Sequence, residues 1–166
     1  LKVEYEKKVK FGVKISIWIS CAILYVCEVA PVTFRFVNKN QDDVFLYVGI
    51  GLAAVGILME IIADAHKSIA KKKNPGRFVT TGLYKIVRCP NYLGEILLWT
   101  GVFVSGISVC NSVWQWVITS VGYIGILYVM FSGARRLEIR QDKNYGNDPE
   151  YQKYVSTTPI LIPLIP

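Results

Sequence analysis

Long, uncharged stretches of hydrophobic residues recur along the chain and are separated by short polar segments. Four of them, at residues 11–30, 44–63, about 93–109 and about 112–131, approach the roughly 20 apolar residues that a transmembrane helix needs. Pro31 is expected to end the first helix, and a very short turn at Asn111 separates the last two. The pattern predicts an all-α, polytopic integral membrane protein with about four transmembrane helices.

The overall composition agrees with this pattern and excludes other classes of protein. Hydrophobic residues make up 52% of the 166 residues and charged residues only 19%, whereas soluble domains usually contain about 25% charged residues. Aromatic residues account for 13%, which argues against a disordered chain. A membrane protein is therefore the class that composition and patterning both favour.

The basic residues indicate how the predicted helices lie in the membrane. The net charge is +7. If the chain crosses the membrane four times, all of the 19 Lys and Arg residues except Arg35 and Lys39 fall on the same side of the membrane. That side holds the N-terminus, the loop at residues 64–92 and the C-terminal tail. The positive-inside rule places it in the cytosol, either at the endoplasmic reticulum of a eukaryote or at the inner membrane of a bacterium. Because orientation and lipid head groups account for the excess charge, no nucleic-acid partner is expected.

The cysteines and the single histidine are not spaced as metal ligands. The four cysteines, Cys21, Cys27, Cys89 and Cys110, form no C-x-x-C pair, and His66 is distant from all of them in sequence. No metal site is therefore predicted.

Acidic residues within the hydrophobic stretches are candidates for function, because charge inside a bilayer is costly. Glu60 and Asp64 are four residues apart at the end of the second predicted helix and so share one face. A salt bridge to Lys67 at a solvated helix end would explain them equally well. Glu28 is close to the end of its span, where a side chain that reaches the lipid head groups is the simpler interpretation.

A polar stripe is predicted on the third helix. Asn91, Glu95 and Trp99 recur every four residues and therefore line one face, and Pro90 suits the first turn of that helix. Polar residues among leucines indicate a cavity filled by water or ligand rather than contact with lipid. Capping by Asn91 and an ion pair between Glu95 and Arg88 would explain part of the set without a ligand.

The segment after the fourth stretch is rich in arginine and tyrosine. These residues are Arg135, Arg136, Arg140, Tyr145, Tyr151 and Tyr154. Arginine binds phosphate with two parallel hydrogen bonds and stacks on aromatic rings. We therefore expect this tail to fold back and to close, together with the loop at residues 64–92, over a nucleotide cavity. A solvated cationic tail is the simpler alternative for any single arginine.

Residues 82–95 carry a longer motif, G-L-Y-K-I-V-R-C-P-N-Y-L-G-E. It resembles G-L-W-x-x-x-R-H-P-N-Y-x-G-E, the signature of a largely uncharacterised membrane-protein branch of the steroid 5-alpha-reductase superfamily. That superfamily is distantly similar to isoprenylcysteine carboxyl methyltransferases. The acidic helix end at Glu60 and Asp64, the pair Ser132 and Gly133, and the tyrosines of the tail also match the branch.

The resemblance implies a membrane-embedded, NADPH-dependent reductase of a carbon–carbon double bond in a lipid of the sterol, enone or fatty-acyl type. Residues 64–166 would form the cofactor-binding region, and residues 1–63 an N-terminal transmembrane hairpin. The cofactor contacts carried over by position are Asp64, Asn91, Tyr92, Glu95, Trp99, Arg135 and Arg136.

Two features depart from that family. Cys89 occupies the position at which the branch usually has His, so any contact made by that His is lost. Family members usually have six or more spans, and this chain begins with Leu1 rather than Met. Beside an active reductase, these departures leave open the C-terminal part of a longer enzyme and a member that binds without reacting.

Two other functions remain open. A membrane methyltransferase of the isoprenylcysteine or phospholipid type shares a similar R-H-P-x-Y-x-G loop and would bind S-adenosylmethionine in place of NADPH. A non-catalytic lipid-binding membrane protein would use the same cavity without chemistry.

Overall fold

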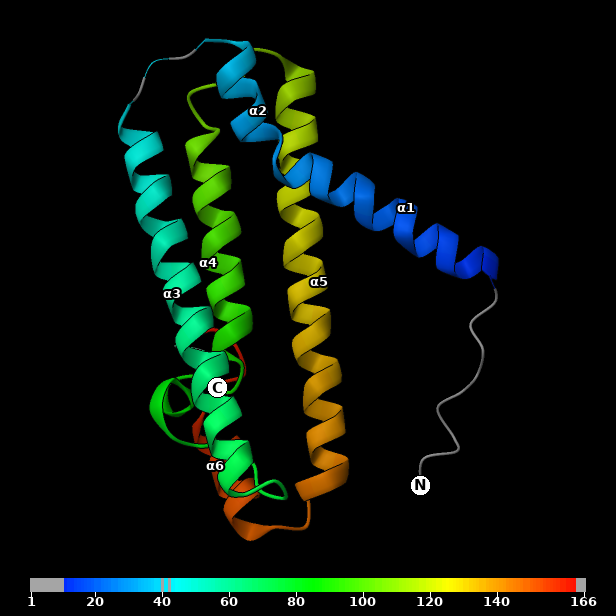
Figure 1. Cartoon of the computed structure of the whole chain (residues 1–166), viewed down its shortest axis with the longest axis vertical. Helices are drawn as coiled ribbons and strands as arrows, with labels where there is room; N and C mark the ends of the chain where they lie inside the picture. Colours follow the sequence, from blue (N-terminus) through cyan, green and yellow to red (C-terminus); the bar gives the residue numbers. More distant parts are fainter. Residues whose placement is uncertain (1–10, 40, 42, 164–166) are drawn as a thin grey trace.

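The computed structural model describes residues 11–39, 41 and 43–163, and within this part of the chain it contains helices and no strand (Figure 1). Its elements are α1 (Phe11–Glu28), α2 (Ala30–Val37), α3 (Val44–Lys73), the 3-10 helix η1 (Gly82–Lys85), α4 (Pro90–Ser105), α5 (Val113–Tyr145) and α6 (Pro149–Thr157). Helices α3, α4 and α5 run side by side, and α1 projects from this bundle at an angle (Figure 1). The predicted all-α class is confirmed. The basic residues Lys2, Lys7, Lys8 and Lys10 lie outside the described residues.

Three of the described helices, α1, α3 and α5, are long and apolar enough to cross a membrane. The third predicted span corresponds to α4, which has 16 residues and is shorter than the about 20 residues of a full crossing. It begins at Pro90, whose missing N–H is harmless in a first helical turn, and ends at Ser105. Three of the four expected spans are therefore confirmed by length and composition, and α4 is a shorter helix within the bundle.

The first predicted helix does not end at Pro31, contrary to expectation. Helix α1 ends at Glu28, Val29 separates it from α2, and Pro31 lies in the first turn of α2. Gly122 of α5 lies against this junction, and a Cβ at that position would come within 2.5 Å of the carbonyl carbon of Cys27. The glycine therefore allows the backbone of α5 to touch the break between α1 and α2.

Helices α3 and α5 continue well beyond the apolar stretches that predict them. With 30 and 33 residues, they are about 45 and about 50 Å long, whereas the hydrocarbon core of a bilayer is about 30 Å thick. Residues 64–73 and 132–145, assigned to loop and tail by the sequence pattern, are thus helical, because they are rich in good helix formers such as Ala, Lys, Arg and Leu. The predicted boundary between the N-terminal hairpin (residues 1–63) and the cofactor-binding region (residues 64–166) therefore lies inside α3. We call this end of the bundle, formed by residues 64–89, residues 132–145 and α6, the polar end.

Helices α3 and α4 are packed together through facing glycines. Gly56 opposes Gly94, and Gly49 opposes Gly101. A Cβ on Gly94 would lie 2.7 Å from the carbonyl oxygen of Gly56, closer than Cβ atoms come to other atoms. Lipid is as apolar as the helices, so close backbone packing of this kind is what holds membrane helices together. It also fixes the start of α4 against the end of α3, where the candidate site lies.

At the opposite end of the bundle, Arg35 of α2 connects several elements. Its guanidinium donates hydrogen bonds to the carbonyl oxygen of Ser105 (3.0 Å) and the hydroxyl of Ser108 (3.3 Å), and lies 3.6 Å from the carboxylate of Asp43. Asp43 caps α3 by accepting a hydrogen bond from the Leu46 amide. Its hydrogen bonds, first that with Ser108 and then that from Leu46, lower the pKa of Asp43.

Candidate functional site

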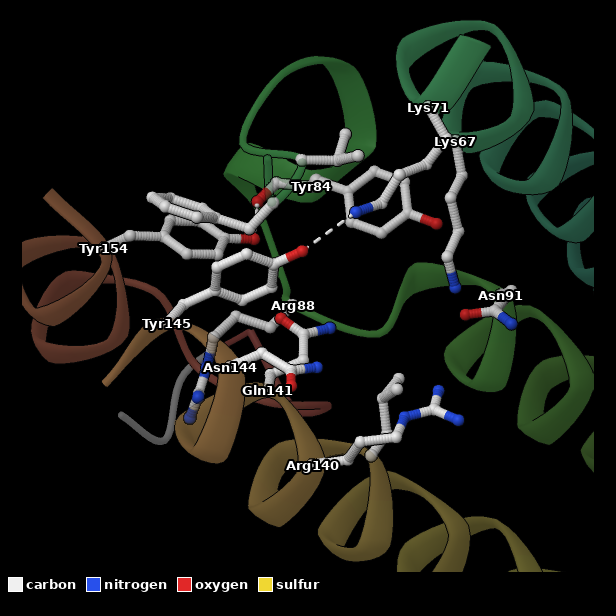
Figure 2. A pocket seen from close by; sticks show the side chains of 13 residues that line it. Lys67, Lys71, Tyr84, Arg88, Asn91, Arg140, Gln141, Asn144, Tyr145 and Tyr154 are labelled. Atoms are coloured by element: carbon white, nitrogen blue, oxygen red, sulfur yellow. Dashed lines mark hydrogen bonds between the residues drawn. The ribbon is translucent and has the colours of Figure 1, made fainter. Parts of the chain in front are cut away.

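The polar end contains a cavity of about 240 Å³ between α3, α4, α5 and α6, which we call the first cavity (Figure 2). Basic side chains, amides and aromatic rings line it, namely Lys67, Lys71, Arg88, Arg140, Asn91, Gln141, Asn144, Phe78, Tyr84, Tyr145 and Tyr154, together with Val79 and Leu137. None of the described residues in this lining is acidic. The first cavity is therefore an electropositive, partly aromatic site.

Two of the four cations come from one face of α3. Lys67 and Lys71 are one helical turn apart, so both side chains extend toward the same space. The amine of Lys71 donates to the carbonyl oxygen of Arg77 (2.7 Å) and to the hydroxyl of Tyr145 (3.1 Å), and the second of these bonds is drawn in Figure 2. Lys67 makes no hydrogen bond or salt bridge with the described residues, and in Figure 2 its amine points toward Asn91.

The other two cations come from the segment before α4 and from the extension of α5. Nη2 of Arg88 lies 2.7 Å from Oε1 of Glu138, whereas Nε of Arg88 is buried without a hydrogen-bond partner among the described residues. Arg140 is exposed and forms no salt bridge with the described part of the chain. A ligand phosphate in the first cavity would therefore meet two cations, Lys67 and Arg140, that are not already engaged.

An aromatic cluster closes the cavity on the side of the tail. The ring of Phe78 lies 5.5, 5.2 and 6.0 Å, centroid to centroid, from the rings of Tyr145, Tyr151 and Tyr154. The hydroxyl of Tyr154 donates to the backbone carbonyl oxygen of Tyr84 (2.7 Å). Burial raises the pKa of both Tyr84 and Tyr154, so their phenol groups stay protonated and can donate hydrogen bonds. The predicted folding of the tail over a cavity is confirmed.

Cys89, at the position where the resemblance leads one to expect His, does not face the first cavity. Its amide donates to the carbonyl oxygen of Ile160 in the tail (3.0 Å), and its side chain packs in a core with Ala134 and Leu161. Burial raises the pKa of the thiol to about 11, which keeps it protonated at neutral pH. Position 89 thus contributes to the attachment of the tail rather than to the lining of the cavity.

Some of the predicted cofactor residues lie in or next to the first cavity. Asn91 lines it, and Tyr92 and Arg136 line a second cavity of about 340 Å³. Leu137 and Arg140 line both cavities, so the two adjoin along α5.

The remaining predicted residues, Asp64, Glu95, Trp99 and Arg135, are in neither lining. Asp64 is exposed on α3, and Arg135 lines a third cavity, of about 590 Å³, on another face of α5. Trp99 lines a small fourth cavity together with Glu28. The predicted stripe on α4 therefore does not face one continuous hollow, because only its first residue, Asn91, reaches the first cavity. The cofactor roles of the four residues stay predictions.

Several residues that line the first cavity were not among the predicted cofactor contacts. Arg88 and Arg140 are ordinary basic residues in the sequence, and Phe78 is a single aromatic residue in a loop. The available signal was the spacing of residues 137, 140, 141 and 144, which marks one face of a helix once α5 is known to extend that far.

Comparison with known proteins gives one family. No curated protein and no solved structure matches the chain. A family model described as "Protein of unknown function (DUF1295)" matches residues 1–158. The matched range contains α1 to α6 and includes every residue that lines the first cavity. The chain therefore belongs to the DUF1295 family.

Proposed function

We propose that this protein is a steroid 5-alpha-reductase-like membrane reductase that uses NADPH to reduce a carbon–carbon double bond in a lipid. The first cavity is the observation that carries the proposal, since four basic side chains and no acidic described residue line it. Phosphate groups are well matched by such a lining, because lysine meets them as a point charge and arginine as a planar fork.

The rest of the lining suits the uncharged parts of a dinucleotide. Tyr84, Tyr145 and Tyr154 gather on one side of the cavity and Lys67 on the other (Figure 2). Planar bases stack on aromatic rings, and amides such as that of Asn91 can bond to their polar edges. The two adjoining cavities measure about 240 and about 340 Å³, so an extended dinucleotide would occupy both.

S-adenosylmethionine fits this site less well. Its sulfonium and amino cations outnumber its one carboxylate at neutral pH. Lys67, Lys71 and Arg140 would therefore repel it overall, without a carboxylate in the described lining to compensate. The carboxylate of Glu138 is already bonded to Arg88. The charge of the cavity thus favours the reductase over the methyltransferase.

The substrate is proposed to be a membrane lipid. The third cavity combines apolar side chains such as Phe131 and Ile160 with Arg135, a pattern that suits an acyl or sterol body with a polar group at one end. The positive-inside rule and the basic residues of the polar end support a cytosolic position for that end, at the endoplasmic reticulum or at a bacterial inner membrane. Bound NADPH would supply the hydride, and the tail residues Tyr145 and Tyr154 would shield the cofactor from water.

Thermal unfolding of the purified protein in detergent, with increasing NADPH or S-adenosylmethionine, tests the proposal. NADPH should raise the unfolding temperature progressively as its concentration increases, with a stabilisation of about 2.7 kcal/mol at 100 times the dissociation constant. S-adenosylmethionine should have no effect. Stabilisation by S-adenosylmethionine alone would favour the methyltransferase, and stabilisation by lipid but by neither nucleotide would favour the non-catalytic binding protein. Either result would contradict the proposal.

A further inference from the structure

Glu28, at the junction of α1 and α2, is a buried acid without a partner. The residue is 3% exposed, and neither of its carboxyl oxygens has a hydrogen-bond partner within the described part of the chain. The indole N–H of Trp99 on α4 is also buried without a hydrogen bond of ordinary geometry. Both side chains line the fourth cavity, which measures about 10 Å³. Two residues whose buried polar groups lack an ordinary hydrogen bond therefore line one small space.

The other polar groups around the fourth cavity are already engaged. The hydroxyl of Tyr123 is 3.0 Å from that of Thr100, and the hydroxyl of Thr119 is 3.7 Å from the sulfur of Cys110. The remaining described walls are apolar, and none is basic. Among the described residues that line this cavity, none could serve as a counter-ion to a negative charge on Glu28.

This environment favours the neutral carboxylic acid and one bound water. An ionised carboxylate buried without a counter-ion or donor costs several kcal/mol, so the protonated form of Glu28 is the stable one. A space of about 10 Å³ is about the size of one water molecule. Such a water would accept the N–H of Trp99 and bond to the carboxyl group of Glu28, which satisfies both groups.

Three further carboxyl groups lead from this cavity to the polar end. Glu95 lies one helical turn before Trp99, close to its indole N–H, and interacts electrostatically with both Glu28 and Glu60. Glu60 packs beside the start of α4, since a Cβ on Gly94 would lie 3.2 Å from the Cβ of Glu60. One turn further along α3, an exposed carboxyl group, that of Asp64, lies at the polar end.

We propose that Glu28 holds a proton inside the bundle and exchanges it with solvent at the polar end through Glu95, Glu60 and Asp64, with a bound water between Glu28 and Trp99. Water molecules would bridge the steps that are too long for direct hydrogen bonds. None of the four carboxyl groups of this proton path lines the first cavity.

The use of this path rests on the proposed function, although the path itself does not. When NADPH reduces a carbon–carbon double bond, hydride forms a C–H bond at one carbon, the π bond breaks, and the other carbon takes up a proton. NADPH becomes NADP⁺, and one proton is consumed for each hydride. A path from the polar end would replace that proton within the membrane.

Infrared spectroscopy of the detergent-solubilised protein tests the path without any substrate. The wild-type protein at neutral pH should show the C=O stretch of a protonated carboxyl group, and Glu28→Gln should remove that band. After transfer to D₂O, exchange of the carboxyl proton for deuterium shifts this band. The rate of that shift should be about tenfold or more lower in Glu95→Gln and Glu60→Gln, which corresponds to about 1.4 kcal/mol in the barrier to proton exchange. Glu150→Gln, a change to an exposed residue of α6 that pairs with Arg77, is the matched control and should alter neither band nor rate.

A band that is missing from the wild type, or that persists unchanged in Glu28→Gln, would overturn the proposal. Equal exchange rates in the wild type, Glu95→Gln and Glu60→Gln would overturn it as well. If Glu28→Gln does not fold, Glu28→Asp serves in its place, and the band should then move rather than vanish. Binding of NADPH is measured separately. NADPH binding in a protein that lacks the carboxyl band would refute only the proton path. The carboxyl band in a protein that does not bind NADPH would refute only the reductase.

Discussion

Arg88 donates a hydrogen bond from Nη2 to Oε1 of Glu138 over 2.7 Å and so joins the segment before α4 to the extension of α5. The two side chains are 14% and 29% exposed, which leaves the pair partly screened from solvent. Glu138 itself lies outside the lining of the first cavity, so it holds Arg88 in position without placing a carboxylate in the site. The cavity therefore keeps its positive charge.

Replacing Glu138 by Gln should lower stability without loss of nucleotide binding. Arg88 would lose its charged acceptor, at a cost of about 1–3 kcal/mol in the free energy of unfolding. The cavity would become more positive, so the affinity for NADPH should be unchanged or higher. Thermal unfolding and NADPH titration measure the two effects, with Glu150→Gln as a control for loss of an exposed pair. Loss of NADPH affinity in a folded Glu138→Gln protein would contradict this interpretation.

Gly56→Ala should destabilise the bundle, whereas Gly51→Ala on the same helix should not. A Cβ at Gly56 would collide with the backbone of α4 at Gly94, and the helices would have to move apart. Such overpacking typically costs about 1–3 kcal/mol. A Cβ at Gly51 would meet nothing within 4 Å, and alanine favours the helix there. Equal unfolding temperatures for the two variants would show that α3 and α4 do not approach each other in this way.

The stabilising effect of Asp43 should depend on pH. Because hydrogen bonds lower its pKa in the folded protein, the ionised form stabilises the fold at and above the usual pKa range of Asp. This contribution should disappear as the pH falls through the lowered pKa. The difference in unfolding temperature between the wild type and Asp43→Asn, measured across acidic pH, should therefore shrink as the pH decreases. A difference that is constant with pH would contradict the ionised cap.

Cys89 should react slowly with a thiol-specific reagent in the folded protein. Its side chain is 3% exposed and the pKa of its thiol is raised to about 11, so little thiolate is present at pH 8. The reaction is followed in a variant whose other three cysteines are replaced by alanine. Leu161→Ala, which opens the core around the thiol, should accelerate the labelling. Rapid labelling of Cys89 without that change would show that the tail does not cover it.

The sequence predicted the helical membrane class because apolar runs of span length have few other interpretations. It also predicted that the tail closes over a cavity, from the arginines and tyrosines alone. It misplaced helix ends where apolarity stops but helix propensity continues, as at residues 64–73 and 132–145. Pro31 was misleading for a related reason, because a proline that ends one helix and a proline that begins the next look alike in a sequence.

The candidate site was only partly predictable. Asn91 could be found because a polar residue at the start of an apolar helix is unusual. The helical spacing of Asn91, Glu95 and Trp99 did not show that the first cavity ends before Glu95 and Trp99. Arg135, Arg136 and Arg140 cannot be told apart in the sequence, yet α5 turns about 100° per residue. Arg135 lines the third cavity, Arg136 the second, and Arg140 both the first and the second. Which arginine faces the site depends on how α5 packs, and that depends on the whole bundle.

The most direct test of the electropositive cavity is NADPH binding, followed by nicotinamide fluorescence, in the double variant Lys67→Gln/Arg140→Gln. Its matched control is Lys72→Gln/Lys73→Gln, which removes the same charge from α3 residues outside the lining. Loss of two charged hydrogen bonds worth about 1.5–3 kcal/mol each should weaken binding at least about a hundredfold in the first variant, and the control should bind like the wild type. Equal NADPH affinity in all three proteins, or no saturable binding to the wild type, would contradict the account.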